Sequence, residues 1–517
     1  MAIDVRARSA AAILSLGALL GTLLGGCTVG PNFEAPSTWS PGSWFRSTPA
    51  PPSLASMPVA EPVDPNWWAV FNDPVLTGLM QRVAGANLDV RTATIRLAQS
   101  RAQRGIAAAD LFPSVNGNGS YTREKPSNNG AISLIGGGAG AASGTAAAAN
   151  NGLGGTVGGF QNTSKIPAFD LFQGGFDASW ELDLWGRVRR AVESADASVD
   201  ASAEARRQTL VTSLAELARD YVQLRGTQDG IRIASSNLET ARESARITTE
   251  RARGGLATDL DVANARAQLE STAATLPQLQ QSEAQQINAI SLLLGAPPGA
   301  LSAELTPPLP VPPVPPIVPV GMPSELARRR PDIRQAEAQL HAATADIGQA
   351  EADFYPKITL SGSFALQATQ FKDLGSWSSR TYGVGPSLTI PIFEGGRLRR
   401  TLDLRKAQQQ EAAINYQRVV LGAFHDVDNA LIAYRAEQQR RDRLVAQVDQ
   451  ARRALGLATS RFRQGISDFL EVLNAQRGVL TAEQQQADST TVVATNLVQL
   501  YKALGGGWEN SPTPPPP

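Results

Sequence analysis

Two stretches of this chain, residues 187–253 and 397–463, run for 67 residues each without a proline. At ~1.5 Å per residue, an uninterrupted helix of that length would extend over roughly 100 Å. Helices in compact domains are far shorter, on average about 10–14 residues. The chain is therefore expected to build long helical rods, and a compact globular domain cannot accommodate them.

Apolar residues recur within each stretch at alternating spacings of four and three. In the first stretch they are Leu210, Leu214, Leu217, Tyr221 and Leu224, and in the second Val420, Phe424, Val427, Leu431 and Tyr434. This heptad spacing predicts a coiled-coil seam along each rod.

The two stretches are copies of one another inside a duplicated chain. Pro113 and Pro356 each follow an Ala-Asp-x-aromatic sequence and differ by 243 positions (356 − 113), whereas Arg187 and Arg397 differ by 210 (397 − 187). The 33 extra residues (243 − 210) lie between Pro113 and Arg187, where a Gly/Ala-rich tract occupies residues 130–159. Such a tract lacks apolar periodicity, and we expect it to form a mobile loop.

The duplication sets the expected domain organisation. Each repeat begins with an Ala-rich helix (88–111 and 332–354), continues through two strands and the long helix, and returns through a second helix (259–294 and 468–504) after a glycine turn. The expected boundaries are a signal peptide 1–26, a Pro/Trp-rich N-terminal segment 27–87, a first repeat 88–300, a Pro-rich joint 301–330, a second repeat 331–507 and a disordered tail 508–517.

The strands alternate apolar and polar residues with period two. The clearest runs through Phe172, Gly174, Phe176, Ala178 and Trp180 on one face. A half-buried strand of a soluble sandwich has the same pattern, as does a barrel strand with lipid outside and water inside. After residue 24 no apolar run approaches the ~20 residues of a spanning helix, so a membrane crossing would require strands closed into a barrel. Four strands are too few, since single-chain barrels start at about eight. Two copies would supply eight strands and three would supply twelve, and a polar-lined passage wide enough for solutes favours three.

The N-terminus carries a targeting signal. Arg6 and Arg8 precede an apolar run from residue 10 to 24, which ends at Gly25-Gly26-Cys27. This pattern predicts cleavage before Cys27 and attachment of lipid, including palmitate, to its thiol. Thr28 stands where an aspartate commonly retains lipoproteins at the inner membrane, so the outer membrane is the expected destination. The alternative is an ordinary secretory peptide with an incidental buried thiol.

Composition argues against catalysis and nucleic-acid binding. The 47 Lys+Arg and 47 Asp+Glu residues cancel, which gives no electrostatic reason to expect nucleic acid. His341 and His425, the only histidines, have no partner at metal-ligand spacing and are interpreted as packed or solvated helix residues. No catalytic motif is found, so we expect no enzyme activity, no metal and no cofactor other than the lipid on Cys27.

Several motifs together resemble the outer-membrane factor family of tripartite efflux systems, which includes TolC and OprM. The chain is most similar to the lipoprotein branch that works with resistance-nodulation-division pumps. The motifs are Cys27-Thr28-Val29-Gly30-Pro31-Asn32-Phe33, Arg329-Arg330-Pro331-Asp332, Pro391-Ile392-Phe393-Glu394-Gly395-Gly396 and Leu470-Glu471-Val472-Leu473-Asn474-Ala475-Gln476-Arg477. The resemblance implies a mainly α fold with a membrane β-barrel, in which a homotrimer forms a twelve-stranded barrel on a twelve-helix coiled-coil tunnel.

The resemblance also implies a function and its sites. The chain would be a passive outer-membrane exit duct with a periplasmic helical extension, fed by an inner-membrane pump through a periplasmic adaptor. Adaptor contacts would fall at the glycine turns, on Gly254, Gly255, Leu256, Thr258, Gly465, Ile466 and Ser467. The constriction would be lined by Leu470, Glu471 and Asn474. Three copies of Glu471 would make an anionic ring, whereas Asn474 departs from the aspartate often found there. A solvated surface glutamate is the alternative for Glu471.

Two other classes of protein share part of this pattern. A structural or adhesive coiled-coil outer-membrane lipoprotein would have the long helices and Cys27, although it would not need four amphipathic strands placed identically in a duplicate. A lipid-anchored periplasmic enzyme would need polar residues converging in a cleft, which rod-like helices do not offer. The sequence does not indicate which substrates are exported.

Overall fold

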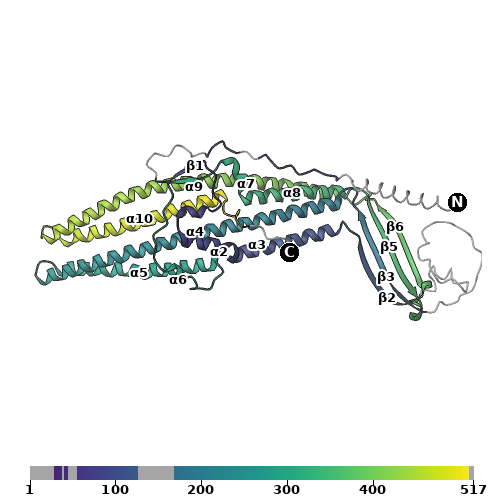
Figure 1. Cartoon of the computed structure of the whole chain (residues 1–517), viewed down its shortest axis with the longest axis horizontal. Coiled ribbons are helices and arrows are strands. Elements are labelled where there is room, and N and C mark those ends of the chain that lie inside the picture. The colour runs from purple at the N-terminus through teal and green to yellow at the C-terminus, as the bar shows by residue number, and fades with distance from the viewer. Residues whose placement is uncertain (1–27, 38–39, 45–54, 126–167, 512–517) are drawn as a thin grey trace, which may run out of the picture. The chain divides into compact units, whose positions relative to one another are not determined.

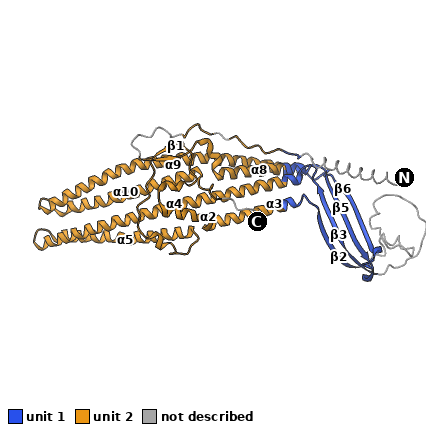
Figure 2. Ribbon diagram, viewed as in Figure 1, with its two compact units in different colours: residues 1–30, 106–190, 348–401 blue, residues 31–105, 191–347, 402–517 orange. Residues whose placement is uncertain are grey.

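The computed structural model describes residues 28–37, 40–44, 55–125 and 168–511 (Figure 1). Cys27, the whole predicted signal peptide (1–26) and the Gly/Ala-rich tract lie outside these residues. The chain divides into two compact units (Figure 2), one of residues 1–30, 106–190 and 348–401 and the other of residues 31–105, 191–347 and 402–517. Each unit takes residues from both sequence repeats, so the repeats fold together and are not separate bodies.

The first unit contains a four-stranded antiparallel sheet in the order β2-β3-β5-β6. Its strands are β2 (Ser114–Glu124), β3 (Phe169–Leu182), β5 (Lys357–Ala368) and β6 (Arg380–Thr389). The strand alternation predicted from the sequence is confirmed by the register, because residues of like character lie opposite one another. Gly117 pairs with Phe176, which pairs with Phe364, which pairs with Tyr382, while Asn116 pairs with Asp177 and then Ser363 on the other face.

The second unit is helical and contains most of each of two long hairpins. Their long arms are α4 (Arg187–Arg253) and α9 (Arg397–Arg463), and their return arms are α5 (Asp259–Leu293) and α10 (Phe469–Leu504). The helices that precede the strands are α3 (Leu88–Ala109) and α8 (Pro331–Ala352). The predicted rods are therefore confirmed as single helices of 67 residues each. Among the described residues, no helix combines the length and apolar character needed to cross a membrane.

Smaller elements surround the middle of the hairpins. They are β1 (Met57–Val59), α2 (Pro74–Ala86), α6 (Ser302–Leu305), β4 (Ile317–Pro319) and α7 (Leu326–Arg329). β1 and β4 pair in parallel, joining the N-terminal segment to the Pro-rich joint. Asp73 caps α2 by accepting from the amides of Val75 and Leu76.

The hydrophobic core of this unit is built on the predicted heptad seams. All ten seam residues are buried, and none exceeds 7% exposure. N-terminal tryptophans pack onto the same core: Trp44, Trp67 and Trp68 are buried, and the ring of Trp67 stacks on Tyr501 at 5.2 Å. This segment therefore completes the core of the helical unit.

The sequence predicted a disordered tail over residues 508–517, but the structure describes residues 508–511. Trp508 is held in place, because its Nε1 donates to the Arg329 carbonyl at 3.0 Å and its ring lies 4.6 Å from the Arg207 guanidinium. Glu509 forms an ion pair with Arg329 at 3.3 Å. The prediction is wrong for residues 508–511, because an aromatic side chain with a hydrogen-bond partner and a stacked cation offsets the entropy of ordering this short segment. Residues 512–517 lie outside the described part of the chain.

Candidate functional site at the helix turns

The two hairpins end in turns with the same backbone hydrogen bonds. In the first turn (residues 254–258), the amides of Gly255 and Leu256 donate to the carbonyls of Ala252 and Arg251. In the second turn (residues 464–468), the amides of Gly465 and Ile466 donate to the equivalent carbonyls of Phe462 and Arg461, 210 positions later. Gly255 and Gly465 have φ of 70° and 76°. This is the Schellman ending of a helix, and its left-handed residue favours glycine.

A side-chain cap starts each return helix. The Thr258 hydroxyl accepts from the Asp261 amide at 3.2 Å, and the Asp261 carboxylate accepts from the Thr258 amide at 2.9 Å. At the second turn, the Asp468 carboxylate accepts from the Glu471 amide at 3.2 Å. Both caps satisfy amides that the first helical turn leaves free, so the chain reverses within a few residues.

Each turn presents two apolar side chains to solvent. Leu256 and Leu260 are 70% and 69% exposed at the first turn, and their equivalents Ile466 and Leu470 are 63% and 52% exposed at the second. The glycines and Thr258 of the predicted adaptor-contact set are exposed beside them, while Ser467 is partly buried. Exposed leucine and isoleucine placed at equivalent positions on both turns are typical of a surface that contacts another protein.

The residues predicted to line a constriction share one face of α10. Leu470, Glu471 and Asn474 are exposed, whereas the intervening Val472 and Leu473 are buried at 3% each. Glu471 and Asn474 are three positions apart, so their side chains lie about one helical turn from each other on the same side. The structure brings these three residues together on an open face, and their role in gating stays a prediction.

Sequence reasoning missed an aromatic cluster beneath the second turn. The rings of Phe462 and Phe469 meet edge to face, with centroids 5.6 Å apart and an interplanar angle of 60°. They pack with Val472 and Leu473 and with Ala245 and Ala265 of the first hairpin. The equivalent positions in the first hairpin hold Ala252 and Asp259. Comparing the two repeats position by position would have revealed this difference.

One arginine of the first hairpin reaches into that cluster. The Arg251 guanidinium lies 4.4 Å from the centre of the Phe462 ring, and its Nη1 donates to the Phe462 carbonyl at 2.5 Å. Further along the hairpins, Gln476 donates to the Ser244 hydroxyl and Arg477 donates to Gln268 at 2.7 Å. The two hairpins are therefore joined near their turns by specific polar contacts.

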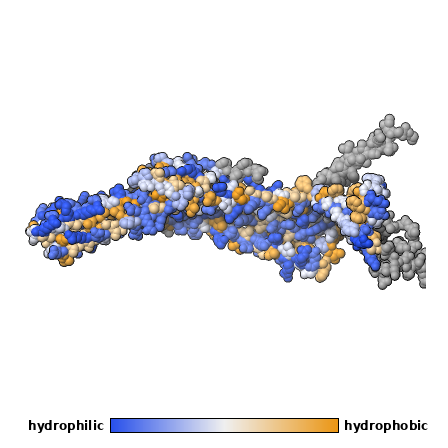
Figure 3. Space-filling view, turned by 90° about the horizontal axis from the view of Figure 1, so that it is seen from below, coloured by the Kyte–Doolittle hydropathy of each residue, from blue (hydrophilic) through white to orange (hydrophobic). Residues whose placement is uncertain are grey.

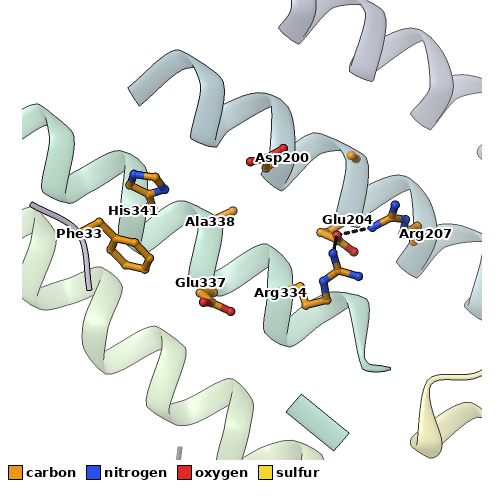
Figure 4. A pocket seen from close by; sticks show the side chains of 9 residues that line it. Phe33, Asp200, Glu204, Arg207, Arg334, Glu337, Ala338 and His341 are labelled. Atoms are coloured by element: carbon orange, nitrogen blue, oxygen red, sulfur yellow. Dashed lines mark hydrogen bonds and ion pairs between the residues drawn. The ribbon is translucent and has the colours of Figure 1, made fainter. Parts of the chain in front are cut away.

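A second polar cluster lies between α4 and α8. Figure 4 shows Glu204 between Arg207 of its own helix and Arg334 of α8, and the Arg334–Glu204 contact measures 2.8 Å. Glu204 is 5% exposed, and burial raises the pKa of its carboxyl. These residues line a cavity of about 350 Å³ with Asp200, Glu337 and His341.

This cluster has a structural explanation. The two arginines that pair with Glu204 also lie against the Trp508 ring, at 4.6 and 5.6 Å, so the ion pairs hold the end of the chain in place. His341 stacks on Phe33 at 4.4 Å and its Nε2 lies 3.0 Å from Glu193, which agrees with the interpretation of a packed histidine. The described residues contain no group of three side chains suited to a metal ion.

Comparison with known proteins decides the family. The family model described as "Outer membrane efflux protein" matches residues 79–296 and 322–506, two segments that correspond to the two repeats. The chain belongs to the outer membrane efflux protein family. This confirms the resemblance drawn from the motifs. The duplicated helix-strand-strand-hairpin fold is likewise confirmed.

Relatives agree along almost the whole length. The chain is 32% identical over 502 residues to the antibiotic efflux pump outer membrane protein ArpC of Pseudomonas putida, covering 96% of each chain. It is 30% identical over 493 residues to the outer membrane protein OprJ of Pseudomonas aeruginosa, covering 95% of each. Among solved structures, the outer-membrane channel OprN superposes with a TM-score of 0.79 at 35% identity, covering 93% of this chain and 100% of that one.

Proposed function

We propose that this chain is one subunit of a homotrimeric exit duct in the outer membrane, through which substrates leave after an inner-membrane pump delivers them by way of a periplasmic adaptor. Relatives named as outer membrane proteins of an antibiotic efflux pump and of a toluene efflux pump support the setting. The structural observation that carries the proposal is the amphipathic sheet with two free edges. The duct itself performs no chemistry and needs no cofactor.

The sheet is incomplete as a membrane structure. Within the described part of the chain, β2 and β6 are its edges, and every residue of β2 is exposed. Open edges cannot persist in lipid, where each unpaired amide or carbonyl costs several kcal/mol. Three copies supply twelve strands, enough to close a barrel with the apolar face toward lipid and the polar face toward water.

Exposed apolar residues on the helices indicate contacts between copies. Leu88 and Ile95 of α3 are 49% and 60% exposed, and Ile414 and Leu421 of α9 are 66% and 51% exposed. Hydrophobic side chains reach the surface over much of the helical unit (Figure 3). Neighbouring subunits would cover these residues and close the helices into a tunnel.

We further propose that Cys27 carries the lipid anchor and that the adaptor docks on the two turns. The exposed Leu256, Leu260, Ile466 and Leu470 would supply its apolar contacts. Three copies of Glu471 would repel one another and select against anions at the constriction. Because Asn474 is uncharged, the ring that its three copies would form adds no further charge to the constriction.

A planar bilayer tests duct and constriction together. The wild type is expected to conduct weakly, and Glu471→Ala is expected to conduct several-fold more, because removing three carboxylates changes both the width and the charge of the narrowest point. Glu411→Ala, an exposed acid of α9 that lies far along the helix from the turn, is the matched control and should behave as wild type. An unchanged Glu471→Ala would return this residue to the solvated surface, and a protein that never conducts would favour an adhesive lipoprotein.

A further inference from the structure

We propose that Asp177 makes the strand region of the duct selective for cations, because its three copies form a ring of carboxylates on the water-facing side of the sheets. The inference rests on the proposed trimeric duct and adds a selecting residue to it. Asp177 belongs to the strand unit, whereas Glu471 belongs to the helical unit. The duct therefore has two rings that sort solutes by charge, and the ring in the strands favours cationic solutes over anionic ones.

The polar face of the sheet has one charged residue in its middle. There the register sets Asn116, Asp177, Ser363 and Gly383 side by side on the four strands. The two adjoining rows on this face are uncharged and consist of Asn118, Gly175, Ala365 and Thr381 on one side and Ser114, Ser179, Ser361 and Gly385 on the other. The carboxylate of Asp177 thus stands alone among amides, hydroxyls and small residues.

The other ionisable residues of this face lie near the ends of strands. Within the described strands they are Glu124, Glu181 and Lys357. Glu181 pairs with Arg187 at 2.8 Å, and Lys357 pairs with Asp353 at 3.0 Å. Glu124 is the last residue of β2. The interior of the polar face therefore carries a single charge, which is negative.

The partners of Asp177 hold its carboxylate without cancelling its charge. The Asn116 Nδ2 donates to one carboxylate oxygen at 3.4 Å, and the Asn118 Nδ2 donates to the other. Among the described residues, no lysine or arginine forms an ion pair with Asp177. An arginine partner would neutralise the site, whereas two neutral amides fix the position of the carboxylate and leave its field open to the passage.

A second aspartate of β3 has the opposite arrangement. Asp170 lies on the apolar face, because successive residues of a strand point to opposite faces. It accepts from the Tyr121 hydroxyl at 2.9 Å and pairs with Arg123 at 3.5 Å. One strand thus carries a neutralised carboxylate on the face turned away from the passage and an unneutralised carboxylate on the face that lines it.

Symmetry multiplies the charge. Equivalent residues of a trimer lie at one level around its axis, so three copies of Asp177 form a ring. Rings of aspartate or glutamate attract cations and repel anions. The field of such a ring reaches about 10 Å at 0.1 M salt and only about 3 Å at 1 M. The selectivity is therefore expected to be strong at low salt and weak at high salt.

The ratio of K⁺ to Cl⁻ permeability tests the inference. It is obtained from the reversal potential of the full-length protein in a planar bilayer across a KCl gradient. Every protein carries Glu471→Ala, so that the other ring does not contribute. In that background Asp177→Asn is expected to lower the ratio roughly two- to fivefold near 0.1 M salt, and to change it little near 1 M.

The same strands supply a control and a rescue. Asp170→Asn makes the same chemical change in β3 on the apolar face, and should leave the ratio unchanged. Asp177→Asn/Ser363→Asp returns a carboxylate to the same row of the sheet, on the neighbouring strand, because Ser363 lies opposite Asp177. This double variant should recover most of the lost selectivity, which a general disturbance of the sheet would not allow.

The outcomes separate the inference from the duct on which it rests. An unchanged ratio in Asp177→Asn, with current and trimeric mass preserved, would overturn the role of Asp177 and leave the duct intact. An equal loss in Asp170→Asn would overturn it as well. If Asp177→Asn does not assemble, a parent protein whose ratio stays constant between about 0.1 and 1 M salt would contradict the ring. Absence of current in every protein would instead defeat the proposed duct.

Discussion

The two hairpin turns have the same backbone and different interiors. Both end their long helix with a left-handed glycine and start the return helix with a side-chain cap. Beneath the second turn, Phe462 and Phe469 form a buried aromatic pair, whereas Ala252 and Asp259 occupy those positions in the first. The backbone of the repeat has been kept and its packing has changed.

The difference gives the two hairpins separate tasks. The second hairpin carries a packed cluster under the face that presents Leu470, Glu471 and Asn474. The first hairpin contributes Arg251, which holds that cluster through the Phe462 ring and carbonyl. The first hairpin thus supports the turn of the second hairpin. Substitutions at equivalent residues of the two hairpins should therefore have unequal effects.

The largest expected effect comes from Phe462→Ala. This side chain is 6% exposed, and truncating a buried phenylalanine typically costs about 3–5 kcal/mol through lost transfer energy and the cavity left behind. Amide hydrogen exchange should show faster opening of the second turn by a corresponding factor, with the first turn changed less. Ile466→Ala, in an exposed side chain of the same turn, is the control and should stay within about 0.5 kcal/mol.

Arg251→Ala should act across the two hairpins. Loss of its hydrogen bond and ring contact is expected to cost about 1–2 kcal/mol in the opening of the second turn. The equivalent Arg461→Ala removes an exposed arginine with no comparable contact among the described residues. It should change the free energy of opening of the second turn by only about a few tenths of a kcal/mol. Equal effects of the two substitutions in hydrogen exchange would show that the hairpins are not held as described.

Glycine substitutions should reveal what the turns share. Gly255→Ala and Gly465→Ala each force an alanine into the left-handed region, at a cost of about 1–2 kcal/mol. Because nothing lies within 4 Å of an added Cβ at either position, backbone strain is the whole effect and should be the same in both. Local opening free energies that differed by more than about 1 kcal/mol would mean that the turns are not backbone copies.

The caps are expected to give the smallest effect. Thr258→Ala and Asp468→Ala each remove one acceptor from a helix start, at about 1 kcal/mol. The Thr258 substitution also removes the hydrogen bond that the Thr258 hydroxyl donates to the Asp261 carboxylate at 2.8 Å, so it should be the larger of the two. Exchange rates of the first amides of α5 and α10 would report both losses, and a larger loss at Asp468 would reverse this ranking.

Much of this fold could be predicted from the sequence because the signals are local and repeated. Proline-free heptads defined α4 and α9, period-two alternation defined the strands, and Gly255 and Gly465 defined the turns. The Arg251–Phe462 contact joins residues 211 positions apart, and no local pattern indicates it. The ion cluster around Glu204 and the anchoring of Trp508 were missed for the same reason, since each depends on which helices become neighbours in space.

Whether this chain forms a conducting trimer is best tested by measuring the mass of the full-length protein in detergent together with its conductance in a planar bilayer. We expect three copies per particle and a small, reproducible ion conductance. A monomer that never conducts would overturn the proposed duct, and would leave the amphipathic sheet and the exposed helix residues without neighbours to cover them.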